Sequence, residues 1–245
     1  MTEPLIAQNI KIESEIISLD KKRELSIFQN NVIIRTNDNN VIKSQYAEYN
    51  KKDKKIILKT NVIARDNHGN LIETSYAEYD EIKELFISEG MTKITTPQKF
   101  IVNGKNIIFD NKKRIIKSDS QAILNDIDNN EIKLSNFEYQ NSNNIFKSIG
   151  KTKILDKFGN SYELSQLYID TKKKEFIGTD IKAFINNDEF KLDKDNKPRI
   201  FANTINIQNE KIEFKKAVFT NCNYRKNDKC PPWSIKSSKI IQDNK

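Results

Sequence analysis

The sequence is poor in the residues on which several classes of protein depend. Its 245 residues include only 6 Gly, 5 Pro, 2 Cys and 1 His. So few glycines and prolines exclude collagen-like, flexible-linker and proline-rich chains. No hydrophobic run exceeds three residues, so the sequence predicts no membrane-spanning helix. One histidine and two cysteines leave little for a metal site or a histidine-based triad, and we predict no metal, no cofactor and no enzymatic activity.

The first twenty residues also lack the basic-then-apolar layout of a signal peptide. The chain is therefore either cytosolic or a mature segment whose leader is absent.

The net charge is +8, from 42 Lys and Arg against 34 Asp and Glu. A basic balance suggests anionic partners such as nucleic acid, anionic lipid or phosphorylated glycolipid. The acids are interspersed with the lysines, however, and no basic cluster with aromatic platforms is visible. We therefore favour a solvated, lysine-rich surface and predict no nucleic-acid binding.

What the sequence does contain is a repeat. An apolar anchor residue recurs at steps of 30 residues, with a final step of 38. The anchors are Leu19, Tyr49, Tyr79, Phe109, Tyr139, Ile169 and Ile207. Another apolar residue lies two positions before each anchor, and the near-identical segments 44–49 and 75–79 argue against chance. We predict seven repeat units.

Each unit has the pattern of two extended legs joined by polar turns. The anchor leg alternates apolar and polar residues, which places the anchor and the residue two positions earlier on one face. Asn, Asp and Gly in the turns supply the positive φ and the side-chain hydrogen bonds that tight connections need. The Asp or Asn after each anchor should serve its turn rather than catalysis, and His68 should be an exposed turn residue. Pro97 and Pro198 fall between legs, where a missing N–H should cost little. Isoleucine-rich legs without a helical period predict an all-β protein with almost no helix.

Stacked units would share one continuous apolar stripe. It could be a filled solenoid core or a partly open groove for extended apolar ligands, and spacing alone does not separate these. The candidate lining residues are Ile17, Leu19, Ala47, Tyr49, Ile56, Ala77, Tyr79, Phe86, Ile107, Phe109, Ile116, Phe137, Tyr139, Phe146, Leu167 and Phe176.

The repeat, with its Ala-x-Tyr-Asp/Asn elements, resembles the OstA/LptA-like modules of lipopolysaccharide (LPS) transport. Residues 217–222 (Ala-Val-Phe-Thr-Asn-Cys) and 230–236 (Cys-Pro-Pro-Trp-Ser-Ile-Lys) resemble the junction before the membrane barrel of the LPS-assembly outer-membrane protein LptD family.

The resemblance implies a repeat β-jellyroll, or β-taco, of stacked antiparallel strands, V-shaped with an apolar interior groove. Residues 1–220 would be the periplasmic domain, and 221–245 a junction toward a C-terminal barrel that this sequence does not include. The function implied is non-enzymatic: shielding lipid A acyl chains and passing LPS from the LptA bridge to the outer-membrane barrel. LptA would pair at the N-terminal edge, and LptE and the barrel would lie at the C-terminal end. The protein would then be periplasmic and attached to the outer membrane through the barrel.

In an oxidising periplasm, Cys222 and Cys230 would form a local disulfide, although family members can also link such cysteines to the barrel. Zinc would need two further ligands, and His68 is too distant. Trp233 is better explained as a packing anchor than as a ligand contact.

Three alternatives remain open. An LptA-like soluble bridge protein would differ in whether a barrel follows residue 245. A β-helical polysaccharide-processing enzyme would need carboxylates clustered on one exposed face, whereas the acids here lie mainly in turns. A structural β-solenoid would fail to bind lipid A.

Overall fold

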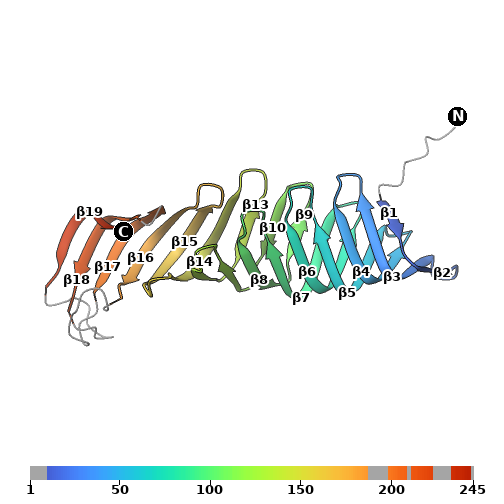
Figure 1. Cartoon of the computed structure of the whole chain (residues 1–245), viewed down its shortest axis with the longest axis horizontal. Coiled ribbons are helices and arrows are strands. Elements are labelled where there is room, and N and C mark those ends of the chain that lie inside the picture. The colour runs from blue at the N-terminus through green and yellow to red at the C-terminus, as the bar shows by residue number, and fades with distance from the viewer. Residues whose placement is uncertain (1–9, 187–197, 209–210, 223–232, 244–245) are drawn as a thin grey trace. The chain divides into compact units, whose positions relative to one another are not determined.

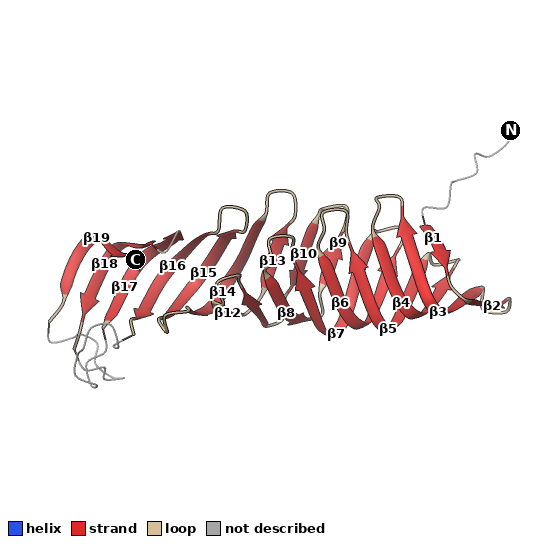
Figure 2. Cartoon of the chain, viewed as in Figure 1, coloured by secondary structure: helices blue, strands red, loops and turns tan. Residues whose placement is uncertain are grey.

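The structure, a computed structural model, describes residues 10–186, 198–208, 211–222 and 233–243. These residues form β-strands, turns and connections and contain no helix (Figure 2). In the described residues there is accordingly no helix that could cross a membrane. Successive strands pair in the antiparallel direction, which confirms the all-β prediction.

The chain divides into two compact units, residues 1–118 and 119–245, called unit 1 and unit 2. Figure 1 labels most of their strands. The strands of unit 1 are β1 (Ile10–Glu13), β2 (Ile16–Asp20), β3 (Leu25–Thr36), β4 (Val41–Asn50), β5 (Lys55–Arg65), β6 (Leu71–Asp80), β7 (Leu85–Thr95), β8 (Ile101–Lys105), β9 (Ile108–Asp110) and β10 (Ile115–Ser118). The strands of unit 2 are β11 (Ala122–Asn125), β12 (Glu131–Leu134), β13 (Phe137–Gln140), β14 (Ile145–Leu155), β15 (Ser161–Asp170), β16 (Glu175–Phe184), β17 (Arg199–Gln208), β18 (Lys211–Thr220) and β19 (Ile235–Asp243). The division expected at residue 220 stays a prediction.

The first kind of turn recurs every 30 residues, and we call these the A turns. They comprise residues 21–24, 51–54, 81–84, 111–114, 141–144 and 171–174. An Asp or Asn before the turn caps it: Asp20 Oδ1 accepts from the backbone N–H groups of Lys22 (3.0 Å) and Arg23 (3.1 Å), and Asn50 Oδ1 accepts from those of Lys52 and Asp53 (both 3.0 Å). The predicted turn role of the Asp or Asn after the anchor is confirmed.

The last residue of each A turn has a left-handed backbone, with φ between 53° and 60°. These residues are Glu24, Lys54, Glu84, Arg114, Asn144 and Lys174. The prediction that Asn, Asp and Gly supply positive φ is therefore wrong at five of these six positions. Neighbouring A turns are also hydrogen-bonded backbone to backbone, which helps to hold this uncommon conformation: the N–H of Glu81 donates to the carbonyl of Lys54 (2.9 Å) and that of Asn111 to Glu84 (3.1 Å).

The second kind of turn, the B turns, comprises residues 36–40, 66–70, 96–100, 126–130 and 156–160. Here the residues with positive φ are mostly those expected: Asn39, Gly69, Lys99, Asn129 and Gly159. Exposed His68 lies in one of these turns, as predicted.

Each long strand bends in the middle. Asn30 and Asn31 in β3, Thr60 and Asn61 in β5, and Gly90 in β7 have positive φ, and the pairing register shifts beside most of them. Such bulges bend a strand and increase its twist. The bend, called the corner, divides each strand into a leg ending at an A turn and a leg ending at a B turn. We call the two sets of legs the A wall and the B wall.

Both walls of unit 1 bury one face. Along the A wall the paired residues Phe28, Ala47, Leu58, Ala77 and Ser88 all have buried side chains. Along the B wall, the corresponding buried row is Ile34, Ile42, Ala64, Ile72, Ile94 and Val102. Because directly paired residues point to the same face, these rows form the core of unit 1.

Unit 2 also has an A wall and a B wall, each with a row of buried residues. Its A wall carries the paired, buried row Tyr139, Phe146, Ile169 and Phe176. Its B wall carries Leu124, Ile132, Ile154, Tyr162, Ala183 and Ile200. The strands β14, β16 and β18 have positive φ at Gly150, Asp180 and Lys216.

Candidate functional site

The sequence-predicted lining residues fall into two groups. Fourteen of the sixteen have buried side chains, with exposed fractions of 8% or less. Ile17 and Leu19 on β2 are instead 57% and 69% exposed. Ile17 pairs with Phe28 and therefore points to the same face as the buried row. Its strand β2 pairs with β3 on one side, and no other described strand pairs with β2.

The B wall, which the sequence pattern did not mark as part of the interior, is also buried. Its residues Ile34, Ala64, Ile94, Leu124 and Ile154 recur every 30 residues and are buried, as are Ile42, Ile72, Val102, Ile132 and Tyr162. These residues follow the same 30-residue period as the anchors. The spacing alone, however, does not predict that the second leg turns back toward the first.

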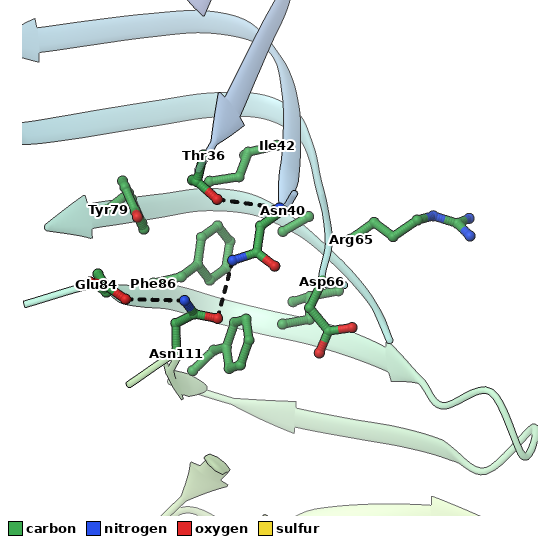
Figure 3. A pocket seen from close by; sticks show the side chains of 12 residues that line it. Thr36, Asn40, Ile42, Arg65, Asp66, Tyr79, Glu84, Phe86 and Asn111 are labelled. Carbon is green, nitrogen blue, oxygen red and sulfur yellow. Dashed lines mark hydrogen bonds between the residues drawn. The ribbon is translucent and has the colours of Figure 1, made fainter. Parts of the chain in front are cut away.

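The interior of unit 1 is enclosed by both walls. A cavity of about 20 Å³, room for about one water molecule, is lined by Ile42, Ala64 and Ile72 of the B wall and by Tyr79, Phe86 and Phe109 of the A wall (Figure 3). This cavity is far too small for an acyl chain. A lipid could enter here only after the walls have moved apart.

The A turns of unit 1 form one rim of the interior, the A rim, and its B turns form the other, the B rim. Polar side chains join the two rims beside this cavity. Asn40 Nδ2, on a B turn, donates to Asn111 Oδ1, on an A turn (3.1 Å), as Figure 3 shows. Asn111 Nδ2 in turn donates to Asp38 Oδ2 (2.8 Å) and Glu84 Oε2 (3.2 Å). We call the bonds from Asn111 to Asp38 and Asn40 the mouth bonds, because they join the A rim to the B rim.

Two buried tyrosines of the A wall lie beside the A turns. The Tyr49 hydroxyl donates to Glu81 Oε2 (2.9 Å), on the neighbouring A turn. Burial, together with this hydrogen bond and the charge of Glu81, raises the pKa of Tyr49 to about 12. Burial and nearby carboxylates, Glu84 foremost, also raise the pKa of Tyr79 well above its usual range. Both phenols therefore stay neutral hydrogen-bonding groups at physiological pH.

A larger concavity of about 610 Å³ lies along the corners of unit 1. Its lining includes Lys43 and Glu73 from outward-facing positions, together with polar Asn31 and Asn61. This mixed, charged lining does not suit an acyl chain.

The interior of unit 2 is also tightly filled. Gly178 pairs with Leu167 and Ile205 on the A wall. A Cβ added at Gly178 would meet Ile205 Cγ2 at 3.0 Å and Leu164 Cδ2 at 3.1 Å. Glycine here makes room for its neighbours, and any larger residue would have to displace them.

No group of three or more metal-binding side chains occurs among the described residues. The carboxylates of the A and B turns are used within the fold; Asp66 Oδ1, for example, accepts from the backbone N–H groups of His68 (3.0 Å) and Asn70 (2.8 Å).

Cys222 is buried and carries a free thiol, with Sγ 3.7 Å from the carbonyl oxygen of Trp233. Cys230 lies outside the described residues, so the pairing of the two cysteines stays a prediction. Trp233 is 47% exposed, and its ring lies 6.1 Å from that of Phe219. The Thr220 hydroxyl donates to the Trp233 carbonyl (2.8 Å), in keeping with a packing role at the end of the sheet.

The chain was compared with family models, curated proteins and solved structures. Residues 7–122 match the family model described as lipopolysaccharide-assembly, LptC-related. No curated protein matches the chain. Among solved structures, the chain is similar to LptH, the LptA-homologous periplasmic component of the lipopolysaccharide transport device of Pseudomonas aeruginosa. The identity is 13%, the match covers 70% of this chain and 82% of that one, and the TM-score of 0.21 supports no conclusion by itself. Over residues 7–122, the chain is thus similar to LptC-related proteins of lipopolysaccharide assembly.

Proposed function

We propose that this chain is a non-enzymatic component of a periplasmic LPS-transport bridge. The observation that carries the proposal is the LptC-related match over residues 7–122, which spans nearly all of unit 1. Unit 1 supplies a fitting chemistry: two walls whose facing surfaces are rows of Ile, Ala, Leu, Phe and Tyr. Lipid A acyl chains would lie between these walls.

Loading would require the A and B rims of unit 1 to separate. The mouth bonds at Asn111 are few, and each hydrogen bond contributes only about 1 kcal/mol net. By contrast, about ten CH₂ groups entering an apolar interior would contribute roughly 8 kcal/mol at about 0.8 kcal/mol each. The displaced core contacts between the walls offset part of this gain. We therefore expect the walls to open in the presence of lipid and to stay closed in its absence.

Photocrosslinking tests this proposal directly. A photoreactive residue at Phe86, on the inner face, should capture LPS, whereas the same residue at Ile87, on the outer face of the same strand, should not. Phe86 is 2% exposed and Ile87 is 36% exposed, so the pair differs in face and not in position along the molecule. Equal capture at both positions, or capture at neither, would refute an internal lipid site.

The open sheet edge at β2 is the proposed docking point for the bridge protein LptA. Ile16, Ile17 and Leu19 are 46%, 57% and 69% exposed, and an unprotected edge strand can accept a partner strand. Photocrosslinkers at positions 16–19 should capture LptA. Capture only through β19, at the other end of the chain, would contradict this orientation.

The LptD interpretation is a second candidate. It rests on the sequence of residues 217–236, whereas the family match is to LptC-related proteins and favours a bridge component. Attachment to the outer membrane, pairing with LptE and delivery to a barrel all belong to this second candidate. Co-purification from envelopes separates the two: LptE should accompany an LptD-type chain and should be missing from a bridge component.

A further inference from the structure

The fold sorts the charges of unit 1 in a way that the sequence does not reveal. Its four A turns contain ten Lys or Arg and four Asp or Glu. Its three B turns, residues 36–40, 66–70 and 96–100, contain one Lys and two Asp. Acids and lysines are interspersed along the sequence, but the 30-residue period places the basic turns on one rim of the fold.

The A turns form a continuous row. The backbone N–H of Lys51 donates to the carbonyl of Glu24 (3.4 Å), and the same bond recurs between the following turns. Successive A turns are two strands apart, which is roughly 10 Å. A ligand with two anionic groups could therefore contact two neighbouring turns.

Two of the four acids of this rim accept hydrogen bonds from uncharged side chains, and Glu84 also lies 3.9 Å from Lys112 Nζ. Glu81 accepts from the Tyr49 hydroxyl, and Glu84 accepts from Asn111. In the part of the chain that the structure describes, no carboxylate lies within ion-pair distance of five of the basic side chains, which are all exposed. These are Lys21, Lys22, Lys51, Lys52 and Arg114.

We propose that the basic A turns of unit 1 bind the phosphate groups of a lipid whose acyl chains lie between the walls. The mouth bonds show that the A rim borders the interior, so a lipid entering there leaves its head group at this rim. Lysine is a flexible point charge suited to phosphate. This inference deepens the proposed function and rests on it.

The test is the affinity of purified lipid A, compared with the same lipid A after phosphatase treatment. The rim variant replaces four unpaired lysines by glutamine: Lys21→Gln, Lys22→Gln, Lys51→Gln and Lys52→Gln. The control variant removes the same charge from exposed positions off the A turns: Lys43→Gln, Lys59→Gln, Lys99→Gln and Lys105→Gln. Thermal melting of both variants should match that of the unmodified chain, because all eight side chains are exposed.

We expect the rim variant to bind lipid A about tenfold more weakly, the size expected for the loss of four exposed charge contacts. Its affinity should depend less on salt, and it should no longer distinguish phosphorylated from dephosphorylated lipid. The control variant should still distinguish them.

Equal affinity of the rim variant and the unmodified chain for lipid A would overturn the inference while leaving the lipid-carrier proposal intact. Failure of the unmodified chain to bind either form of lipid A would overturn the carrier proposal itself. Loss of binding only to phosphatidylglycerol vesicles, with lipid A affinity unchanged, would assign the rim to a membrane surface and also overturn the inference.

Discussion

Replacing Pro97 with alanine should stabilise the protein, although removing a proline from a turn usually has the opposite effect. The reason is an asparagine ladder that links successive B turns. Asn40 Oδ1 accepts from the backbone N–H of Asn67, 27 residues later, at 3.0 Å. Within unit 2, Asn130 Oδ1 accepts in the same way from Lys157 at 3.0 Å.

The ladder breaks at Asn70. Twenty-seven residues after Asn70 stands Pro97, which has no N–H to donate. Asn70 is 1% exposed, and its Oδ1 atom has no hydrogen-bond partner among the residues that the structure describes. Pro97 does lie beside this turn, because a Cβ added at Gly69 would meet Pro97 Cγ at 3.3 Å. The missing N–H at Pro97, which the sequence predicts to cost little, thus leaves this buried acceptor without a donor among the described residues.

The magnitude follows from three contributions. A new hydrogen bond contributes about 1 kcal/mol, and satisfying a buried acceptor relieves a further penalty of about 1 kcal/mol or more. Loss of the proline costs about 0.4–1 kcal/mol through the greater entropy of the unfolded chain. We expect Pro97→Ala to raise the free energy of unfolding by about 1 kcal/mol, or the melting temperature by roughly 2–4 °C.

Urea unfolding in a double-mutant cycle with Asn70→Ala is the decisive assay. In the Asn70→Ala background the acceptor is gone, so Pro97→Ala should only destabilise. Destabilisation of similar size in both backgrounds would refute the ladder argument, and so would an unchanged unfolding midpoint for Pro97→Ala alone.

Three further predictions concern the interior and the C-terminal region. Ala77 is fully buried, so Ala77→Asp should cost about 3 kcal/mol or more in urea unfolding, while the outward-facing control Glu78→Ala should change the stability by less than about 0.5 kcal/mol. Folding of Ala77→Asp at unchanged stability would show that the walls part freely in the empty protein. The pKa of Tyr49 is raised to about 12, so the unfolded chain loses this proton first and the free energy of unfolding should fall as the pH rises from about 10 toward 12. Tyr49→Phe should make this fall less steep, and an identical slope in titrated unfolding curves would contradict the assignment. Under oxidising conditions, non-reducing mass mapping should find a Cys222–Cys230 peptide pair, whose nine-residue loop would contribute roughly 2–3 kcal/mol; two free thiols would argue against a local bridge.

The sequence by itself determined the period, the strand faces and the first turns. Alternation of apolar and polar residues fixed which side of each anchor leg is buried, because side chains alternate across a strand. The Asp or Asn that follows most anchors predicted the A turn, because such side chains accept hydrogen bonds from the backbone N–H groups of a turn. Fourteen of the sixteen predicted lining residues are buried for this reason.

Only the tertiary structure showed that the two legs of each strand fold toward each other, so that the A wall faces the B wall. The corners depend on residues such as Thr60 and Lys216, whose positive φ no local rule predicts. Once the strands bend there, the B wall faces the A wall, Asn111 reaches Asn40 across 71 residues, and Ile17 and Leu19 stay exposed because β2 is an edge. The bend also carries every A turn of unit 1 to one rim. Charges that are interspersed along the chain are thereby separated in space, since position on a rim depends on the 30-residue period and not on sequence neighbours.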